Sequence, residues 1–268
     1  MLHDVAPTHR IRRSRLNTVR ESLHRVLAIS HHNVRLRLRD PGQAISYLVL
    51  PMILMVVLKP LYIRAVPGGS TQVVIGLVVM FSVLAVGIAG SSILVERQWH
   101  TWDRLRQTRA GSAEILLGKV APIYLLMLLQ QTILLTFGCV VIGMPWPDSP
   151  VLVAVAILVW SFALLAIGAA LATIARSLSE LGAISDVGAM VLSSLAGALV
   201  PLSILPGWVE VAAHASPGYY ALEMLRAAVA GDTRQVLGNA AVLIAVGLAA
   251  GGYAIHRLAR GWGRTRLL

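Results

Sequence analysis

Few residues in this 268-residue sequence have the types and spacing that catalysis requires. The nearest match to a phosphate-binding loop is Gly111–Val120, with the sequence GSAEILLGKV. Such a loop needs four residues between its glycines and a Ser or Thr after its Lys to bind magnesium. Here six residues separate Gly111 from Gly118, and Val120 follows Lys119. The sequence therefore predicts that this chain does not hydrolyse ATP by itself.

The sequence offers no stronger candidate residues for metal binding or for acid–base catalysis. The sequence contains no His-Glu-x-x-His motif and no Cys/His set with metal-ligand spacing. Cys139, the single cysteine, excludes a cysteine-based zinc cluster and an intramolecular disulfide. Four of the eight histidines are scattered near the ends of apolar stretches, where polar anchoring is favoured over catalysis; these are His31, His32, His214 and His256. We expect neither catalytic residues nor a resident metal or cofactor.

The rest of the chain consists mainly of long apolar segments. Hydrophobic residues make up 57% of it and charged residues 13%, against about 25% charged residues in a typical soluble domain. A helix of about 20 apolar residues crosses a bilayer. Six segments reach that length, approximately Ala44–Ile63, Val73–Val95, Val120–Ile142, Val151–Ala175, Ile184–Leu205 and Gln235–Ile255. The sequence predicts an all-α integral membrane protein with six transmembrane helices.

Two of the six segments carry polar or helix-bending residues. In the first, Pro51 is expected to kink the helix, and the side chains of Lys59 and Arg64 must extend to the membrane surface. In the fifth, Asp186 lies about one turn from the predicted start, close enough to the interface to be tolerated. No other ionisable residue comes as near to mid-membrane.

The distribution of Lys and Arg predicts the orientation. Of 23 such residues, 19 lie in 1–43, in 96–119, in the turn after the fourth segment and in the C-terminal tail. By the positive-inside rule, both termini and loop 96–119 are cytoplasmic, and we predict a multi-pass protein of a bacterial plasma membrane. The net charge of +11 could indicate nucleic-acid binding, but the basic residues flank apolar spans, so we expect no nucleic-acid partner.

Three domains follow from this pattern. Residues 1–43 form a cytoplasmic segment, 44–256 the six-span membrane domain and 257–268 a basic cytoplasmic tail. In the first, apolar residues from Leu16 to Val34 recur every three or four positions, which predicts an amphipathic helix lying on the membrane surface. Between the fifth and sixth spans, Pro206–Thr233 is semi-apolar and suits a hairpin that dips into the outer leaflet.

Loop 96–119 lies between two segments of 23 residues that carry no charge. Trp99, Trp102 and Leu105 follow a three-residue spacing, which predicts a lipid-facing stripe on a short helix. The charged side chains then face water or a partner; these are Glu96, Arg97, Asp103, Arg104 and Arg106. A simply solvated positive-inside loop is the alternative interpretation.

The string Glu96-Arg97-x-x-x-Thr101-x-Asp103-x-Leu105, followed by Thr108, Glu114 and Gly118-Lys119, favours the first interpretation. It resembles the loop between spans two and three of ABC-2-type permeases. These are the membrane subunits of drug, lipid and polysaccharide exporters, including the daunorubicin-resistance type. Three positions depart from the family pattern: His100 replaces Gly, Arg109 replaces Pro and Asp103 replaces Glu.

A second motif occurs far away in the sequence. It runs Pro201-Leu-Ser-Ile-Leu-Pro206-Gly-Trp208, then Pro217-x-x-Tyr220-x-x-Glu223-x-x-Arg226. It resembles the end of span five and the outer re-entrant hairpin in the same family. The resemblance thus implies a re-entrant hairpin carrying Pro206, Trp208, Pro217, Tyr220, Glu223 and Arg226.

The resemblance also implies partners. A separate ABC-type ATPase, present in two copies, would bind ATP and Mg and grip loop 96–119 as a coupling helix. The contact residues would be Glu96, Arg97, Trp99, Trp102, Asp103, Arg104 and Arg106, with Glu114 and Lys119 at the foot of span three. A second permease, identical or related, would complete the pathway, together with membrane lipids.

In the family, spans two and five line the central cavity. The residues that this implies are Met80, Phe81, Ser82, Met190, Ser193, Ser194 and Leu195. Such a lining suits outward transport of an amphipathic or hydrophobic substrate, such as a drug, an antibiotic or a lipid. The alternative is that these residues only pack helices against one another.

Two other functional classes remain as alternatives. An ion-coupled secondary transporter needs ionisable residues at mid-membrane, and only Asp186 comes near that depth. An integral-membrane enzyme acting on lipids needs an acid, base or metal set, which the sequence does not provide.

Overall fold

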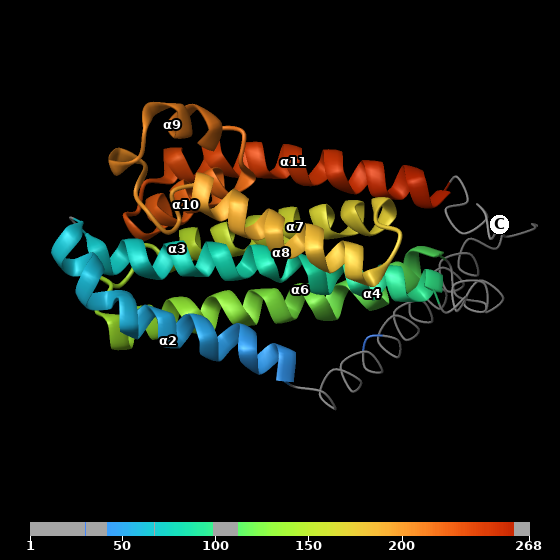
Figure 1. The fold of residues 1–268 in the computed structure, drawn as a ribbon, viewed down its shortest axis with the longest axis horizontal. Coiled ribbons are helices and arrows are strands. Elements are labelled where there is room, and N and C mark those ends of the chain that lie inside the picture. The colour runs from blue at the N-terminus through green and yellow to red at the C-terminus, as the bar shows by residue number, and fades with distance from the viewer. Residues whose placement is uncertain (1–29, 31–41, 67, 99–111, 260–268) are drawn as a thin grey trace, which may run out of the picture.

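The computed structural model describes residue 30 and residues 42–66, 68–98 and 112–259 (Figure 1). Within these ranges the chain forms helices and no strand. In order they are α2 (Gly42–Ala65), α3 (Gly69–Leu84), α4 (Val86–Gln98), α6 (Ser112–Phe137), the π turn η1 (Gly138–Ile142), α7 (Pro150–Ile174), α8 (Leu178–Leu195), the 3-10 turn η2 (Leu202–Ile204), α9 (Gly207–Ala213), α10 (Pro217–Val229) and α11 (Thr233–Ala259).

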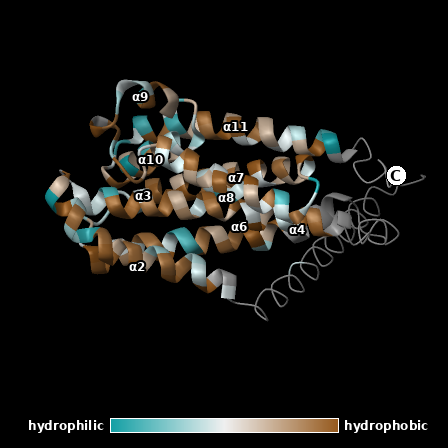
Figure 2. Cartoon of the chain, in the orientation of Figure 1, coloured by the Kyte–Doolittle hydropathy of each residue, from teal (hydrophilic) through white to brown (hydrophobic). Residues whose placement is uncertain are grey.

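Six helical stretches are long and apolar enough to cross a membrane, which confirms the predicted number of spans. They are Ile45–Ala65, Gly69–Val95, Val120–Ile142, Pro150–Ile174, Leu178–Leu195 and Thr233–Arg257. They lie roughly parallel to the long axis of the molecule, and apolar residues cover most of their length (Figures 1 and 2). The predicted amphipathic N-terminal helix lies outside the described residues, except for Ser30.

The fifth span differs from its predicted bounds, Ile184–Leu205. Helix α8 begins six residues earlier, because Ser177 accepts a hydrogen bond from the backbone N–H of Glu180 at 3.1 Å. The Glu180 carboxylate in turn accepts from the backbone N–H of Arg176, the residue before the N-cap, at 2.8 Å, which ties the preceding chain to the first turn of the helix. The helix ends at Leu195, ahead of Gly197 with its positive φ of 77°.

This shift corrects the predicted depth of Asp186. The residue is the ninth of 18 in α8, so it lies at the middle of the span and not about one turn from its start. Average hydropathy favours a later start because Ser179 and Glu180 are polar, whereas the capping hydrogen bonds decide where the helix begins.

The second span consists of two helices. A single residue in a turn conformation, Ala85, separates α3 from α4. The span also begins earlier than the predicted Val73, at Gly69. In contrast, α2 continues through both Pro51 and Pro60 as one helix.

The second span lies at the centre of the molecule, because 78% of the most apolar 18-residue stretch within it is buried. Glycines allow close packing around it: a Cβ at Gly90 of α4 would lie 2.9 Å from the carbonyl oxygen of Gly168 in α7. One polar pair joins the second span to α7 in the core, where the indole N–H of Trp160 donates to Ser82 Oγ at 2.7 Å.

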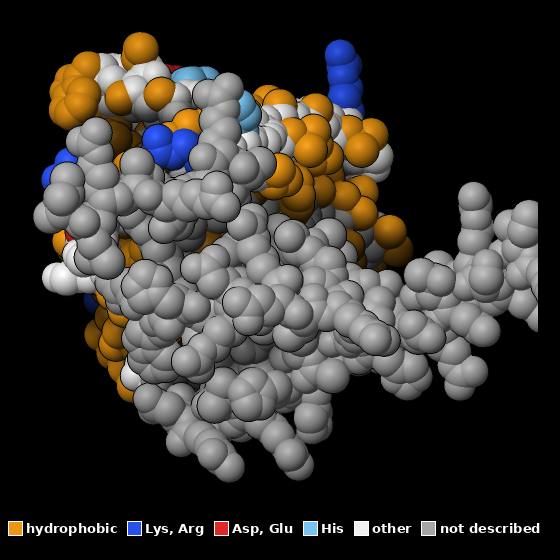
Figure 3. Space-filling model, turned by 90° about the vertical axis from the view of Figure 1, so that its right-hand side faces the viewer, with side chains coloured by type: hydrophobic (Ala, Val, Ile, Leu, Met, Phe, Trp, Pro, Cys, Tyr) orange, Lys and Arg blue, Asp and Glu red, His pale blue; other side chains and the backbone are white. Residues whose placement is uncertain are grey.

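The two ends of the bundle differ. At one, which we call the hairpin end, lie α9, α10 and the turn between α2 and α3 (Figure 1). At the other lie the end of α4, the start of α6, the turn between α7 and α8 and the end of α11. Seen from that opposite end, the described side chains on the flanks are mostly hydrophobic (Figure 3). Apolar flanks along the described helices suit a protein that crosses a bilayer.

Candidate functional site

The predicted coupling loop joins two helices at the end of the bundle opposite the hairpin. Glu96 and Arg97 belong to the last turn of α4, and Glu114 and Lys119 to the first two turns of α6. The other predicted contact residues lie outside the described residues; these are Trp99, Trp102, Asp103, Arg104 and Arg106. The backbone therefore brings the four helical positions to one end of the molecule, and the role of the loop stays a prediction.

At the hairpin end, a polar network surrounds Arg226 of α10. Its guanidinium donates to Glu223 Oε1 at 2.5 Å and, through Nη2, to Gln72 Oε1 of α3. Gln72 in turn donates to the carbonyl oxygen of Gly197 at 2.9 Å, just beyond α8. The hydroxyl of Tyr62 in α2 donates to the carbonyl oxygen of Leu199 in the same segment. The network thus connects α10 with α2, α3 and the chain that follows α8.

Packing leaves this network little freedom. Gln72 is 4% exposed, and a Cβ at Gly76 would lie 1.9 Å from the carbonyl oxygen of Ala198. Helix α10 is capped by Ser216, whose hydroxyl accepts from the N–H of Gly218 and donates to the carbonyl oxygen of Leu192 in α8, both at 3.2 Å. Because buried polar groups are costly without partners, these bonds hold α10 and the end of α8 together.

Aromatic residues of the hairpin form a second cluster. Tyr219 contacts Tyr220 edge-on at 5.3 Å between ring centroids, and His214 lies 4.6 Å from Tyr219. Burial, followed by the nearby Glu223 carboxylate, raises the pKa of the Tyr219 phenol, so its neutral form is favoured. On α9, by contrast, Trp208 is 68% exposed. The hairpin therefore has a packed helix, α10, and an exposed apolar edge, α9.

The sequence motif includes Pro206, Pro217, Tyr220, Glu223 and Arg226 but not Gln72. The structure brings Gln72 to Arg226 across 154 positions of sequence. In the sequence, Gln72 is a single amide side chain near the start of an otherwise apolar span. Such a residue by itself does not indicate a hydrogen-bond partner.

The predicted pathway residues on α3 divide by burial. Met80 is half-buried at the surface of α3, whereas Phe81 and Ser82 are 3% and 1% exposed. Ser82 donates to the carbonyl oxygen of Val79 at 2.8 Å and accepts from Trp160, so its side chain points into the protomer. Of these three residues, Met80 is the one accessible to a substrate or a partner.

The predicted residues on α8 divide in the same way. Met190 is 62% exposed and Ser194 is also exposed, while Leu195 is half-buried. Ser193 is fully buried, and its hydroxyl has no hydrogen-bond partner among the described residues. A lining role remains a prediction for all of them, and exposure singles out Met190 and Ser194.

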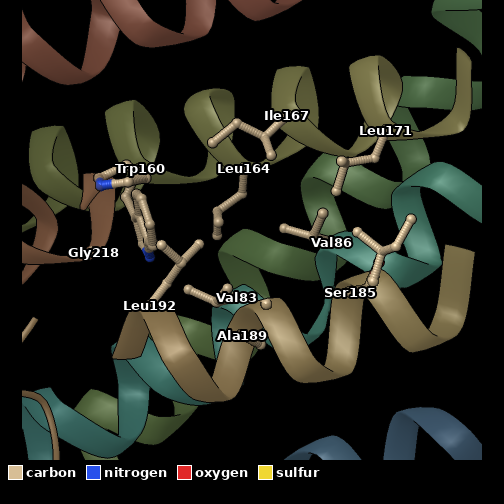
Figure 4. Close-up of a pocket in the computed structure, with 13 residues that line it drawn as sticks. Val83, Val86, Trp160, Leu164, Ile167, Leu171, Ser185, Ala189, Leu192 and Gly218 are labelled. Carbon is tan, nitrogen blue, oxygen red and sulfur yellow. The ribbon is translucent and has the colours of Figure 1, made fainter. Parts of the chain in front are cut away.

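Helix α8 has one packed and one open face. The packed face carries Ser185, Ala189 and Leu192, which point toward α7 and border a small apolar cavity of about 50 Å³ (Figure 4). On the open face, exposed residues recur every three or four positions: Ala183, Asp186, Met190 and Ser194. Asp186 is thus the acidic residue on the open face, at the middle of the span.

The described residues contain no cluster of three or more His, Cys, Asp or Glu side chains able to hold a metal ion.

The model of the family described as ABC-2 type transporter matches residues 24–229, about three quarters of the chain. The chain belongs to this family. The matched region includes loop 96–119 and the whole of α10, and it ends at the last residue of α10. A comparison with curated proteins finds no significant match.

As an ABC-2 type transporter, this chain is a membrane component of an ABC transporter with six candidate spans. The family pairs such components with an ABC ATPase in general. The resemblance deduced from the two motifs is therefore confirmed at the level of the family.

Proposed function

We propose that this ABC-2 chain is the permease subunit of an ATP-driven exporter that moves an amphipathic or hydrophobic substrate outward across the plasma membrane. The observation that carries the proposal is the open face of α8, where Asp186, Met190 and Ser194 combine polar and apolar groups from the middle of the span to its end. The exposed side chains of α2 at similar depth, such as Ile53, Val56 and Val57, are aliphatic and suit lipid.

The pathway runs along a surface of the protomer and not through it. The second span is largely buried by its own chain, and the cavity between α7 and α8 measures about 50 Å³, which has room for a few water molecules but not for an amphipathic substrate. A second permease, identical or related, covers the open face of α8 and completes the pathway. Symmetric pairing of two such faces is the common solution for membrane and soluble oligomers alike.

Two copies of an ABC ATPase bind at the end formed by α4 and α6, where Gln98 and Ser112 flank the coupling loop. The charge distribution supports a cytoplasmic location for this end and for both termini. ATP and Mg bind to the partner, because the phosphate-binding motif is missing here.

The second span transmits movement from that end to the hairpin. It runs 27 residues from Gly69 to Val95, about 40 Å at 1.5 Å per residue. Near its start, Gln72 bonds to Arg226 of α10, and its far end leads into the coupling loop. A displacement of the loop therefore shifts the hairpin, which we place at the outer leaflet as a re-entrant element.

The test reverses the charge of the loop by R104E and R106E together, in membrane vesicles that also contain the ATPase. We expect substrate-stimulated ATP hydrolysis and transport to fall while the permease still inserts, because the contact with the ATPase loses its charge complementarity. Unchanged coupling at normal expression would overturn the role of the loop. Transport driven by a proton gradient without ATP would instead favour an ion-coupled carrier.

A further inference from the structure

Asp186 is unusual among the charged residues of the described spans. Lys59 lies six residues from the end of the first span, and its Nζ donates to the carbonyl oxygen of Val141 at 3.2 Å. Glu180 lies two residues from the start of α8. Asp186, in contrast, is eight residues from the start, about 12 Å along the helix axis, and nine from the end. It is the charged residue furthest from either end of a described span.

The side chain of Asp186 has no partner within the described part of the protomer. It is exposed, and none of the hydrogen bonds or ion pairs found there involves it. The large residues beside it on α8 are apolar: Val187 is 64% exposed and Met190 62%. A carboxylate that faces lipid at mid-span is costly, so residues of this kind face a protein interior or an aqueous pathway and bind ions or ligands.

We propose that Asp186 binds the cationic group of a lipophilic substrate, so that the exporter prefers amphipathic cations to neutral or anionic molecules of the same shape. This inference rests on the proposed function. The carboxylate takes the positive charge, and Ala183 and Met190, one turn away on either side, contact the apolar body. Methionine suits this role because its flexible, polarisable side chain adapts to ligands of varied shape.

A second copy of the chain does not supply the missing cation. The basic residues of the described spans lie toward their ends: Lys59, Arg64, Arg234 and Arg257. A symmetric partner would instead bring a second Asp186 to the same depth, because both copies use the same surface. Two carboxylates in a poorly hydrated pathway attract a cation more strongly than one.

The experiment measures binding to the complete permease–ATPase complex in phosphatidylcholine nanodiscs. The probes are tetraphenylphosphonium and tetraphenylborate, which have nearly the same shape and opposite charge. We expect the native complex to prefer the phosphonium, and D186N to weaken phosphonium binding by about tenfold, as loss of a charge-assisted contact predicts. D186E should retain the preference.

The matched control is E180Q, which replaces a carboxylate with an amide on the same helix near its end. The side-chain oxygen of Gln can still accept from the backbone N–H of Arg176, and the backbone N–H at position 180 still donates to Ser177, so α8 is retained and phosphonium binding should not change. Equal binding of the two probes by the native complex, no phosphonium binding at all, or an unaltered affinity in D186N would overturn the inference.

The same complex separates this inference from the proposed function. If phosphonium binding depends on Asp186 but ATP drives no transport of it, the binding site stands and the exporter function fails. If ATP drives export of a neutral amphiphile while the complex does not distinguish the two probes, the exporter function stands and the cation site fails.

Discussion

The link between Arg226 and Gln72 can be tested by replacing both residues with apolar ones of similar length. In R226M, the Oε1 of Gln72 loses its partner while it is 4% exposed, which costs about 1–3 kcal/mol. The ion pair with Glu223 adds at most about 1 kcal/mol, because its two side chains are 33% and 29% exposed and solvent screens them. We expect R226M to lower the free energy of unfolding by about 1–4 kcal/mol.

A double-mutant cycle isolates the contact. In a Q72L background no buried amide remains, so R226M should cost about 1 kcal/mol or less, and the coupling energy should be about 1–3 kcal/mol. The assay is reversible unfolding by titration with sodium dodecyl sulfate in mixed micelles, followed by tryptophan fluorescence. The control is R234M, which removes the same charge from an exposed position at the start of α11 and should change stability by less than about 0.5 kcal/mol.

The result that would refute the reasoning is an equal cost of R226M in both backgrounds, within about 0.5 kcal/mol. Such a result would mean that the hydrogen bond between α10 and α3 makes no net contribution. The proposed transmission from the second span to the hairpin would then lack its physical connection.

Two further changes probe the packing on which the site depends. G76A should destabilise the protein by about 1–3 kcal/mol in the same titration, since its Cβ would lie 1.9 Å from the Ala198 carbonyl oxygen, whereas G238A, with open space around it, should be neutral or stabilising. W160F removes the hydrogen bond to Ser82, and differential scanning of the purified permease should detect a loss of about 1 kcal/mol; Ser82 keeps its bond to Val79, so a loss above about 3 kcal/mol would contradict this account.

The number and approximate positions of the spans could be predicted because hydrophobicity over about 20 residues is a local property. The predicted span Val120–Ile142, for example, lies within the continuous helical stretch formed by α6 and η1, Ser112–Phe137 and Gly138–Ile142. The limits of the fifth span could not be found in this way. They depend on hydrogen bonds at Ser177 and Glu180 and on the positive φ of Gly197, to which average hydropathy is insensitive.

The candidate site shows the same division. Two motifs were enough to indicate the family, because they retain the residue types of a loop and a hairpin in the right order. In the structure, however, Met190 and Ser194 are exposed, whereas Ser193 on the same helix is buried. The sequence alone gives no reason to distinguish the three residues. Burial is decided by which face of α8 meets α3 and α4, and that depends on residues distant in the chain.

By itself, the sequence determined that this is a six-span membrane protein of the ABC-2 type, since apolar length and motif order need no knowledge of tertiary contacts. Tertiary structure alone decided that Gln72 meets Arg226 and that Asp186 lies exposed at mid-span. The reason is physical: membrane insertion depends on the composition of each segment, whereas pairing and exposure depend on how the segments pack against one another.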